Sequence, residues 1–278
     1  MMDQTIDIVA AMAVSSVPLI LAALGGLLAE RAGVLNIAME GCMGAGAFAA
    51  AVLSASGAPP LAAVLGALAA GAVLGTLMAG VHLKLGSNLF IAGLGVNLLV
   101  PSLTGLISQS LYGHKGNIRI SAPSPEGAAW GMIPLALAVA LLLGRSAFGR
   151  RLRAVGDSAE FVSERGLSPV GIRTAALLVS AASAALGGAF LAFRIDAFVP
   201  GMSSGRGWMA LVLIWLGFRR PIGIVGMAYL FSLIEIISGR TQGWASLPAS
   251  LSQAWPYLIA LLALTVSSIA GQAELQKK

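Results

Sequence analysis

The stretch Gly201-Met-Ser-Ser-Gly205 matches the G-x-S-x-G pattern of serine hydrolases, in which the central serine attacks an acyl carbon. Such a serine needs a histidine base within reach and a sharp turn from a strand into a helix. The sequence contains two histidines, His82 and His114, which we expect near opposite ends of the fold. We therefore expect no catalytic residue and interpret Ser203 and Ser204 as part of a flexible external loop.

Metal chemistry is not expected either, because neither histidine has a partner at metal-ligand spacing and the sequence contains no H-E-x-x-H motif. The single cysteine, Cys42, lies in an apolar segment rich in alanine and glycine. It can form neither an internal disulfide nor a cysteine cluster. We expect no metal and no cofactor in this chain.

A segment of unusual charge lies between residues 145 and 173. Its first part, RSAFGRRLRAVGDSAEFVSERG (145–166), holds five arginines and three acids, and Arg173 follows. Two or three arginines would be enough to orient a membrane protein. The mixed signs, with Glu160 and Glu164 at helical spacing, predict a short amphipathic helix on which a charged partner docks. A solvated surface without a partner is the alternative.

Polar side chains inside long apolar segments are the other candidates, because polarity within a membrane is costly and usually faces a cavity or a partner. Asn36 and Glu40 lie one helical turn apart, and Asn97 lies in the apolar segment 88–111. We predict that these three residues line a translocation path. The structural alternative stays open for each of them, since Glu40, for example, could pair with Arg31 or extend to the membrane interface.

The apolar segments themselves are typical of a membrane protein. The chain has 278 residues, of which 58% are hydrophobic and 10% are charged, and these charges are too few to cover a soluble domain. A spanning helix needs about 20 apolar residues. We predict an all-α polytopic membrane protein with about eight or nine transmembrane helices, near 8–28, 37–56, 61–83, 88–111, 129–144, 172–193, 222–238 and 255–271, with a short or re-entrant helix at 208–218.

Basic residues set the expected orientation. Twelve of the 17 Lys and Arg residues fall on one side of these spans, among them Arg31, Lys84 and the six arginines from 145 to 173. The positive-inside rule places this side in the cytoplasm. We therefore expect the N-terminus outside, as an uncleaved first helix, and the C-terminus inside.

Small residues at four-residue spacing predict close helix packing. Gly71, Gly75 and Ala79 form one such series, and Gly41 and Ala45 form another. Residues of this kind let helix backbones approach in membrane bundles. We expect both series to make helix–helix contacts rather than a ligand cleft.

Two longer motifs resemble a known family. The run Gly149-Arg-Arg-Leu-Arg-Ala-Val-Gly-Asp157, followed by Gly166-Leu-Ser-Pro-Val-Gly-Ile172, is similar to the cytoplasmic coupling loop of permease subunits in ABC importers of the branched-chain amino acid, ribose and nucleoside group. The run Leu24-Gly-Gly-Leu-Leu-Ala-Glu-Arg-Ala-Gly-Val-Leu-Asn-Ile-Ala-Met-Glu-Gly41 resembles the simple-sugar or nucleoside permease subfamily, which works with basic-membrane-protein-type lipoproteins. The similarity in pattern covers most of the chain.

The resemblance implies a single permease domain over residues 1–278, with a type II-like ABC importer permease fold and a coupling loop at about 145–173. It implies a transport subunit of the bacterial cytoplasmic (inner) membrane and not an enzyme. The residues that match the coupling loop are Gly149, Arg150, Arg153, Ala154, Gly156, Asp157, Glu160 and Gly166.

The same resemblance implies the partners. ATP and Mg are expected on a separate cytoplasmic ABC ATPase, and the absence of a Walker motif from this sequence agrees with that. A second, related permease is expected, as a heterodimer rather than a homodimer, together with an external substrate-binding lipoprotein and membrane lipid. The net charge of +6 is scattered over short loops, so no nucleic acid partner is expected.

The substrate implied by the subfamily is a nucleoside. A flat base stacks on aromatic rings, so Phe90 and Trp208 join the candidate path, although both could equally be anchors at the membrane interface. A simple sugar, riboflavin or another small metabolite on the same scaffold is the alternative. An ion-coupled secondary transporter is less favoured, because we expect Glu40 and Glu235 near span ends, whereas that class places buried acids within its spans.

Overall fold

The computed structural model describes residues 2–120, 126–241 and 265 of the chain. Nearly all of its regular structure is helical. The longer helices are α1 (Met2–Arg31), α2 (Met39–Ala55), α3 (Pro60–Ala79), α4 (Leu89–Tyr112), α6 (Met132–Arg145), α9 (Pro169–Arg194) and α11 (Pro221–Thr241). The shorter elements are the π-helical turn η1 (Gly80–Lys84) and the helices α5 (Glu126–Trp130), α7 (Ala147–Asp157), α8 (Ala159–Glu164) and α10 (Arg206–Leu216).

The prediction of a polytopic helical membrane protein is confirmed. Six helices are long and apolar enough to cross a bilayer, namely Asp7–Arg31, Pro60–Lys84, Leu89–Tyr112, Gly127–Arg145, Pro169–Arg194 and Pro221–Gly239. Two shorter apolar helices, α2 and α10, accompany them. The count of eight or nine stays a prediction, because the expected span 255–271 lies outside the described residues except for Thr265.

One small sheet departs from the all-α expectation. Strand β1 (Ile118–Arg119) pairs antiparallel with β2 (Ala197–Phe198), with Ile118 opposite Phe198. The pair joins the segment after α4 to the segment after α9, which are far apart in sequence. Its backbone groups satisfy one another where the chain leaves the helices.

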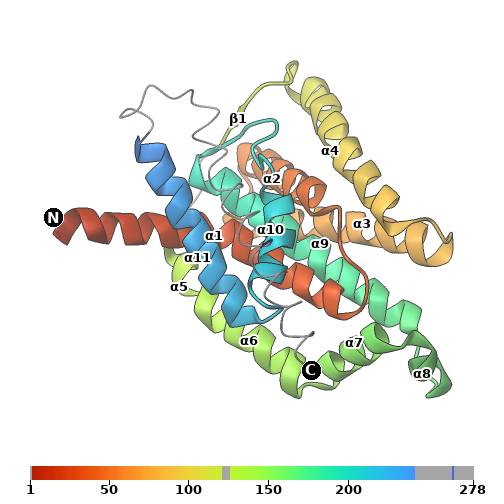
Figure 1. Ribbon diagram of the computed structural model, residues 1–278. Helices are drawn as coiled ribbons and strands as arrows, with labels where there is room; N and C mark the ends of the chain where they lie inside the picture. The colour runs from red at the N-terminus through yellow and green to blue at the C-terminus, as the bar shows by residue number, and fades with distance from the viewer. Residues whose placement is uncertain (1, 121–125, 242–264, 266–278) are drawn as a thin grey trace.

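Helix α9 lies at the centre of the bundle, against α1, α2 and α3 (Figure 1). Its glycines and alanines allow this, because a Cβ added to Gly188 would collide with the carbonyl oxygen of Met43 on α2. The predicted series on α3 has the same role, since a Cβ on Gly71 or Gly75 would meet the α9 backbone. The expectation of helix contacts is therefore confirmed for Gly71 and Gly75. Gly41 packs against the α4 backbone, but it also lines the cavity described below, which the expectation did not include.

Two shorter apolar helices, α2 and α10, begin after non-helical chain. Residues 32–38 separate α1 from α2, and residues 199–205 lead from β2 into α10. At 1.5 Å per residue, α10 is roughly 16 Å long, about half of a bilayer. The starts of α2 and α10 touch, because a Cβ on Gly207 would collide with the backbone of Glu40.

From this shared point α2 and α10 run to opposite ends of the fold. The second half of α2 approaches the strand pair, where the rings of Phe48 and Phe198 pack edge to face with centroids 5.2 Å apart. The turn after α10 reaches the end of α1, where Arg31 Nη2 donates to the carbonyl oxygen of Arg219 at 2.7 Å. We call these the strand end and the α7 end of the fold, since α7 packs beside Arg31.

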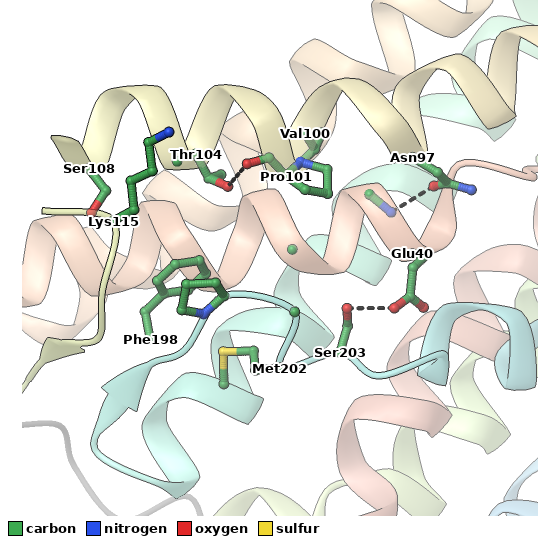
Figure 2. A pocket seen from close by; sticks show the side chains of 15 residues that line it. Glu40, Asn97, Val100, Pro101, Thr104, Ser108, Lys115, Phe198, Met202 and Ser203 are labelled. Atoms are coloured by element: carbon green, nitrogen blue, oxygen red, sulfur yellow. Dashed lines mark hydrogen bonds between the residues drawn. The ribbon is translucent and has the colours of Figure 1, made fainter. Parts of the chain in front are cut away.

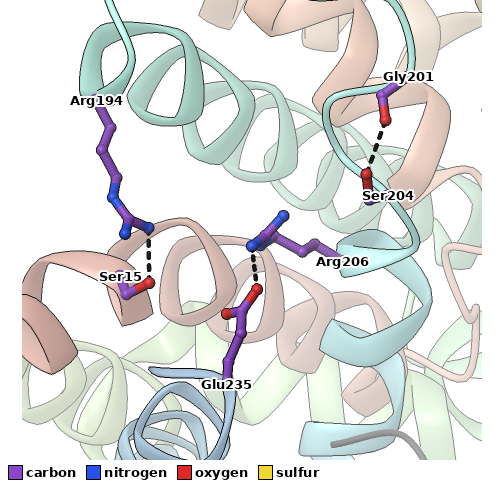
Figure 3. Close-up of polar contacts among 6 residues, drawn as sticks. All are labelled: Ser15, Arg194, Gly201, Ser204, Arg206 and Glu235. Carbon is purple, nitrogen blue, oxygen red and sulfur yellow. Dashed lines mark hydrogen bonds and ion pairs between the residues drawn. The ribbon is translucent and has the colours of Figure 1, made fainter. Parts of the chain in front are cut away.

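Charged side chains also join helices inside the bundle. Arg206, at the start of α10, forms an ion pair with Glu235 of α11, and Arg194, at the end of α9, donates to Ser15 Oγ of α1 at 2.6 Å (Figure 3). At the α7 end, Arg219 pairs with Glu30 at 2.6 Å, and the Glu30 side chain is 7% exposed. The Arg206 and Arg219 pairs hold the two ends of α10 to α11 and α1, and the Arg194 contact joins α9 to α1.

We predict that Gly188→Leu destabilises the bundle, because the side chain would push α9 away from the Met43 carbonyl. Overpacking of this kind costs about 1–3 kcal/mol. Thermal unfolding of the purified protein in detergent measures the change. Gly226→Leu, at an exposed site on α11 with nothing within 4 Å of its Cβ position, is the control. Equal melting temperatures for the two variants would contradict the prediction.

Candidate functional site

A cavity of about 290 Å³ lies between α2, α4 and the chain that precedes α10 (Figure 2). Most of its surface is apolar, and a few polar groups converge on it, as is typical of small-molecule sites. It is lined by Glu40, Gly41, Gly44, Asn97, Val100, Pro101, Thr104, Gly105, Ser108, Lys115, Phe198, Pro200, Gly201, Met202 and Ser203.

Glu40 forms one end of this cavity, which we call its floor. Its Oε1 accepts hydrogen bonds from Ser203 Oγ at 2.6 Å and from the Gly205 N–H at 2.9 Å. Its Oε2 accepts from the Gly207 N–H at 2.8 Å. The carboxylate thus caps the N-terminus of α10, where backbone N–H groups lack partners within the helix and the helix dipole favours negative charge. We refer to these three bonds as the Glu40 cap.

Asn97 lies beside Glu40 and caps the N-terminus of α2. Its Oδ1 accepts from the Gly41 N–H at 2.7 Å, and its Nδ2 donates to the Ile37 carbonyl oxygen at 2.9 Å. A side chain of α4 therefore satisfies both the first turn of α2 and the non-helical segment before it. Asn97 is therefore both part of the cavity wall and the residue that caps α2.

The opposite end of the cavity, its mouth, carries Lys115 from the segment after α4, as Figure 2 shows. Ser108 Oγ donates to the His114 carbonyl oxygen at 2.9 Å, and Thr104 Oγ1 donates to the Pro101 carbonyl oxygen at 3.1 Å. The hydroxyl protons are thus used within the chain, while the oxygen lone pairs remain. Phe198 adds an aromatic surface.

The structure brings two of the five predicted path residues, Glu40 and Asn97, into this cavity. Asn36 is 1% exposed, donates to Ser180 Oγ at 3.0 Å and accepts from the Ala38 N–H at 3.0 Å, so it ties residues 32–38 to α9. Phe90 and Trp208 are 53% and 39% exposed and do not line the cavity.

The structure decides between the alternatives left open for Glu40. Glu40 binds α10, while the Arg31 guanidinium donates to the Arg219 carbonyl oxygen. Glu40 lies in the first turn of α2, as expected, and about one α10 length, roughly 16 Å, from the α7 end. Residues 32–38 separate it from the end of α1.

Ser203 was expected in a flexible external loop, and the structure places it in the cavity floor. It is 6% exposed, and its hydroxyl donates to Glu40 and not to a histidine. His82 and His114 have backbone partners near their own positions in the chain. The G-x-S-x-G match thus has no hydrolase geometry, and its glycines and serines belong to the turn that enters α10.

Sequence reasoning missed Thr104, Ser108, Lys115, Phe198 and Ser203 as cavity residues. A signal existed for the first two, because they lie with Asn97 and Pro101 on one side of an otherwise apolar helix at spacings of three to four residues. The other three approach only through the tertiary contact between the segments after α4 and α9.

The charged segment folds as two short helices at the α7 end. Leu152 and Val155 of α7 and Val162 of α8 are buried, while the arginines and acids of both helices are exposed. The predicted amphipathic helix is confirmed. Arg173 of α9 holds the segment in place, because its guanidinium donates to the carbonyl oxygens of Ala32 at 3.2 Å and Val155 at 3.4 Å.

Two glycines of this segment are packed against the chain itself. A Cβ on Gly149 would collide with the Leu142 carbonyl oxygen of α6, and one on Gly156 would collide with the Arg31 carbonyl oxygen at the end of α1. Gly166 follows α8 with φ +74°, and the N–H groups of Gly166 and Leu167 close a Schellman-type turn. The close backbone approach that Gly149 and Gly156 permit thus occurs within the chain.

The other matched residues are distributed over the outside of α7 and α8. Arg153, Asp157 and Glu160 are exposed, Ala154 is half-buried, and Arg150 is exposed with one donor on the Arg145 carbonyl oxygen at 2.9 Å. None of these charges forms an ion pair with another described residue. The surface therefore presents both signs of charge to a partner.

The chain is similar to permeases of ABC transporters. It is 29% identical to the nucleoside ABC transporter permease protein NupC of Lactococcus lactis subsp. cremoris, over 93% of this chain and 91% of the relative. It is 30% identical to the guanosine ABC transporter permease protein NupQ of Bacillus subtilis, over 97% and 94%, and 32% identical to the putative glucose ABC transporter permease protein TsgC13 of Haloferax volcanii, over 81% and 74%.

No solved structure gives a significant match to the chain. A family model described as a branched-chain amino acid transport system permease component matches residues 8–268, which include the cavity, α7, α8 and α10. With a match of this extent, the chain belongs to that family of permease components, as a membrane transport subunit of an ABC importer and not an enzyme.

Proposed function

We propose that this permease carries nucleosides into the cell through the cavity between α2, α4 and α10. The observation that carries the proposal is the similarity to the nucleoside and guanosine permeases, which extends over more than nine-tenths of this chain and of each relative. The cavity agrees with such a substrate, because it combines aromatic and apolar walls for a base with hydroxyl and carboxylate groups for a sugar.

A simple sugar is the second candidate substrate. It is favoured by the similarity to the putative glucose permease, although that match covers less of both chains. Sugars and nucleosides share hydroxyl groups, and the polar end of the cavity suits both. The walls formed by Phe198, Pro101 and Met202 favour the substrate with a flat ring.

The exposed charges of α7 and α8 are the proposed docking surface for the cytoplasmic ABC ATPase, which would bind ATP and Mg. This places the α7 end in the cytoplasm, the strand end outside, and the N-terminus outside with the C-terminus inside. A second, related permease and an external substrate-binding lipoprotein complete the proposed importer of the bacterial inner membrane. The mixed charge on α7 and α8 supports a protein partner, since complementary charge steers and orients docking.

Uptake of radiolabelled guanosine and uridine by a deletion strain tests the substrate. We expect uptake to fall to background and to return when the gene is supplied again. Labelled glucose and riboflavin are measured in the same cells. Unchanged nucleoside uptake together with lost glucose or riboflavin uptake would overturn the nucleoside assignment while retaining the importer.

The position of Gly156 against Arg31 predicts a role in coupling. Gly156→Leu would displace α7 from the end of α1, and we expect the ATP hydrolysis stimulated by the loaded binding protein to fall by roughly tenfold, the size of a coupling change of about 1–2 kcal/mol. Gly144→Leu is the matched control, since Gly144 is an exposed helical glycine nearby with nothing within 4 Å of its Cβ position. Stimulation equal to that of the control would contradict the prediction.

Charge reversal on α7 tests the docking surface directly. Arg153→Glu and Asp157→Arg alter exposed side chains without breaking an ion pair among the described residues. We expect each variant to retain about a tenth of the ATPase that co-purifies with the wild type, because unfavourable charge across an interface costs on the order of a kcal/mol or more. Arg119→Glu, an exposed reversal at the strand end, should retain all of it. Equal co-purification of all three would remove the docking role.

A further inference from the structure

We propose that Glu40 selects substrates with vicinal hydroxyl groups. Binding of such a substrate weakens the hydrogen bonds of the Glu40 cap and thereby allows α10 to move. The proposal rests on the proposed function and deepens it. It concerns the sugar part of the substrate, which nucleosides and simple sugars share. The argument starts from the hydrogen-bonding capacity of the cavity floor.

A sugar hydroxyl that donates a hydrogen bond needs an acceptor, and Glu40 carries the only carboxylate among the residues that line the cavity. A charged acceptor forms a hydrogen bond about twice as strong as a neutral one. Carboxylates bind ribose hydroxyls in this way in dinucleotide-binding folds. Glu40 is therefore the strongest hydroxyl acceptor that a substrate meets in this cavity.

The orientation of the substrate follows from the two ends of the cavity. Glu40 lies at the floor, and Lys115 and Phe198 lie toward the mouth (Figure 2). A sugar placed against Glu40 leaves an attached base beside Phe198, with the Lys115 ammonium near the acceptor atoms that every nucleobase carries. A substrate turned the other way would place its apolar face against the charged floor.

The Glu40 carboxylate already uses most of its capacity. An ionised carboxylate has about four acceptor sites, and Ser203, Gly205 and Gly207 occupy three of them. A single hydroxyl can use the remaining site. The second hydroxyl of a vicinal pair needs a site that the cap occupies, and the Ser203 hydroxyl is the partner that can rotate away most easily.

The exchange leaves no backbone group without a partner. A hydroxyl donates one proton and also accepts through its oxygen, so once Ser203 has turned away, a diol at Oε1 can donate to the carboxylate and accept the neighbouring Gly205 N–H. A substrate that lacks the diol cannot accept this N–H group, and the cap stays closed. Selection and loosening thus depend on the same two hydroxyls.

Movement at the start of α10 would reach the α7 end, because the helix is rigid over its 11 residues. The turn after it is bonded to Arg31 and Glu30, and Arg31 is the residue whose carbonyl oxygen contacts Gly156 of α7. The floor of the cavity and the proposed ATPase surface are therefore connected through α10 and the end of α1.

The test compares a ribonucleoside with its 2′,3′-dideoxy analogue in cells that contain the complete importer. The ratio of the two uptake rates is measured for wild type, Glu40→Gln, Glu40→Asp and the control Ser102→Ala, an exposed α4 hydroxyl outside the cavity. The binding protein is the same in every strain, so a change in the ratio arises in the permease. Glutamine keeps the shape of the side chain, but its NH₂ group cannot accept from Gly207 or from a hydroxyl.

We expect the wild type and Ser102→Ala to share one ratio, and Glu40→Gln to lower that ratio by about tenfold, the effect of losing a hydrogen bond to a charged group. Glu40→Asp should recover part of it. In proteoliposomes with the loaded binding protein, ATP hydrolysis by Glu40→Gln should no longer distinguish the two nucleosides. If Glu40→Gln lowers both uptake rates equally, or leaves both unchanged, Glu40 only caps α10 and the proposal is overturned.

A wrong substrate class would give a different result. If the wild type imports glucose and no nucleoside, the proposed function fails, and the corresponding ratio is then measured for methyl glucoside against methyl 3-deoxyglucoside, which has no vicinal hydroxyl pair. A tenfold change of that ratio in Glu40→Gln would support hydroxyl selection, and an unchanged ratio would overturn it.

Discussion

The structure depends on how it satisfies the backbone groups at the starts of α2 and α10. The first N–H groups of a helix have no partner within it, so at a buried helix start other parts of the protein must supply one. Asn97 and Asn36 supply partners around the start of α2, and Glu40 supplies them for α10. These side chains hold together the segments that border the cavity, so the two helix starts and the site have one physical origin.

Close packing around α9 makes such an arrangement possible. The collision of any side chain at Gly46 or Gly188 with the facing backbone means that α2 and α9 lie nearly in backbone contact. In a membrane, helices associate through packing and hydrogen bonds and not through a hydrophobic effect. The small residues therefore fix where α2 starts, and with it the position of Glu40. The cavity is then lined by α4 on one side and by Glu40 and residues 198–203 on the other.

The spans were predictable from the sequence because runs of about 20 apolar residues leave few alternatives. The spacing of Glu160 and Glu164 predicted the short helix α8 but not α7, and the apolar run 208–218 predicted a short helix close to α10. The cavity residues were harder to predict. Asn97 and Glu40 stood out as polar residues in apolar surroundings, but Ser203 looked like loop chemistry, and Lys115 enters only through the pairing of β1 with β2. Such contacts between distant segments have no local signal.

The turn after α10 shows how firmly this helix is held at the α7 end. Phe218 and Arg219 both have positive φ, 55° and 56°, a conformation that bulky side chains rarely adopt. Strain of this kind persists only where surrounding contacts enforce it. Here Arg31 binds the Arg219 carbonyl and Glu30 binds its guanidinium. At its other end α10 is tied to α2 by Glu40 and to α11 by Glu235. A displacement of α10 must therefore move α1, α2 or α11 with it, which makes this half-helix the element best placed to connect the cavity with α7.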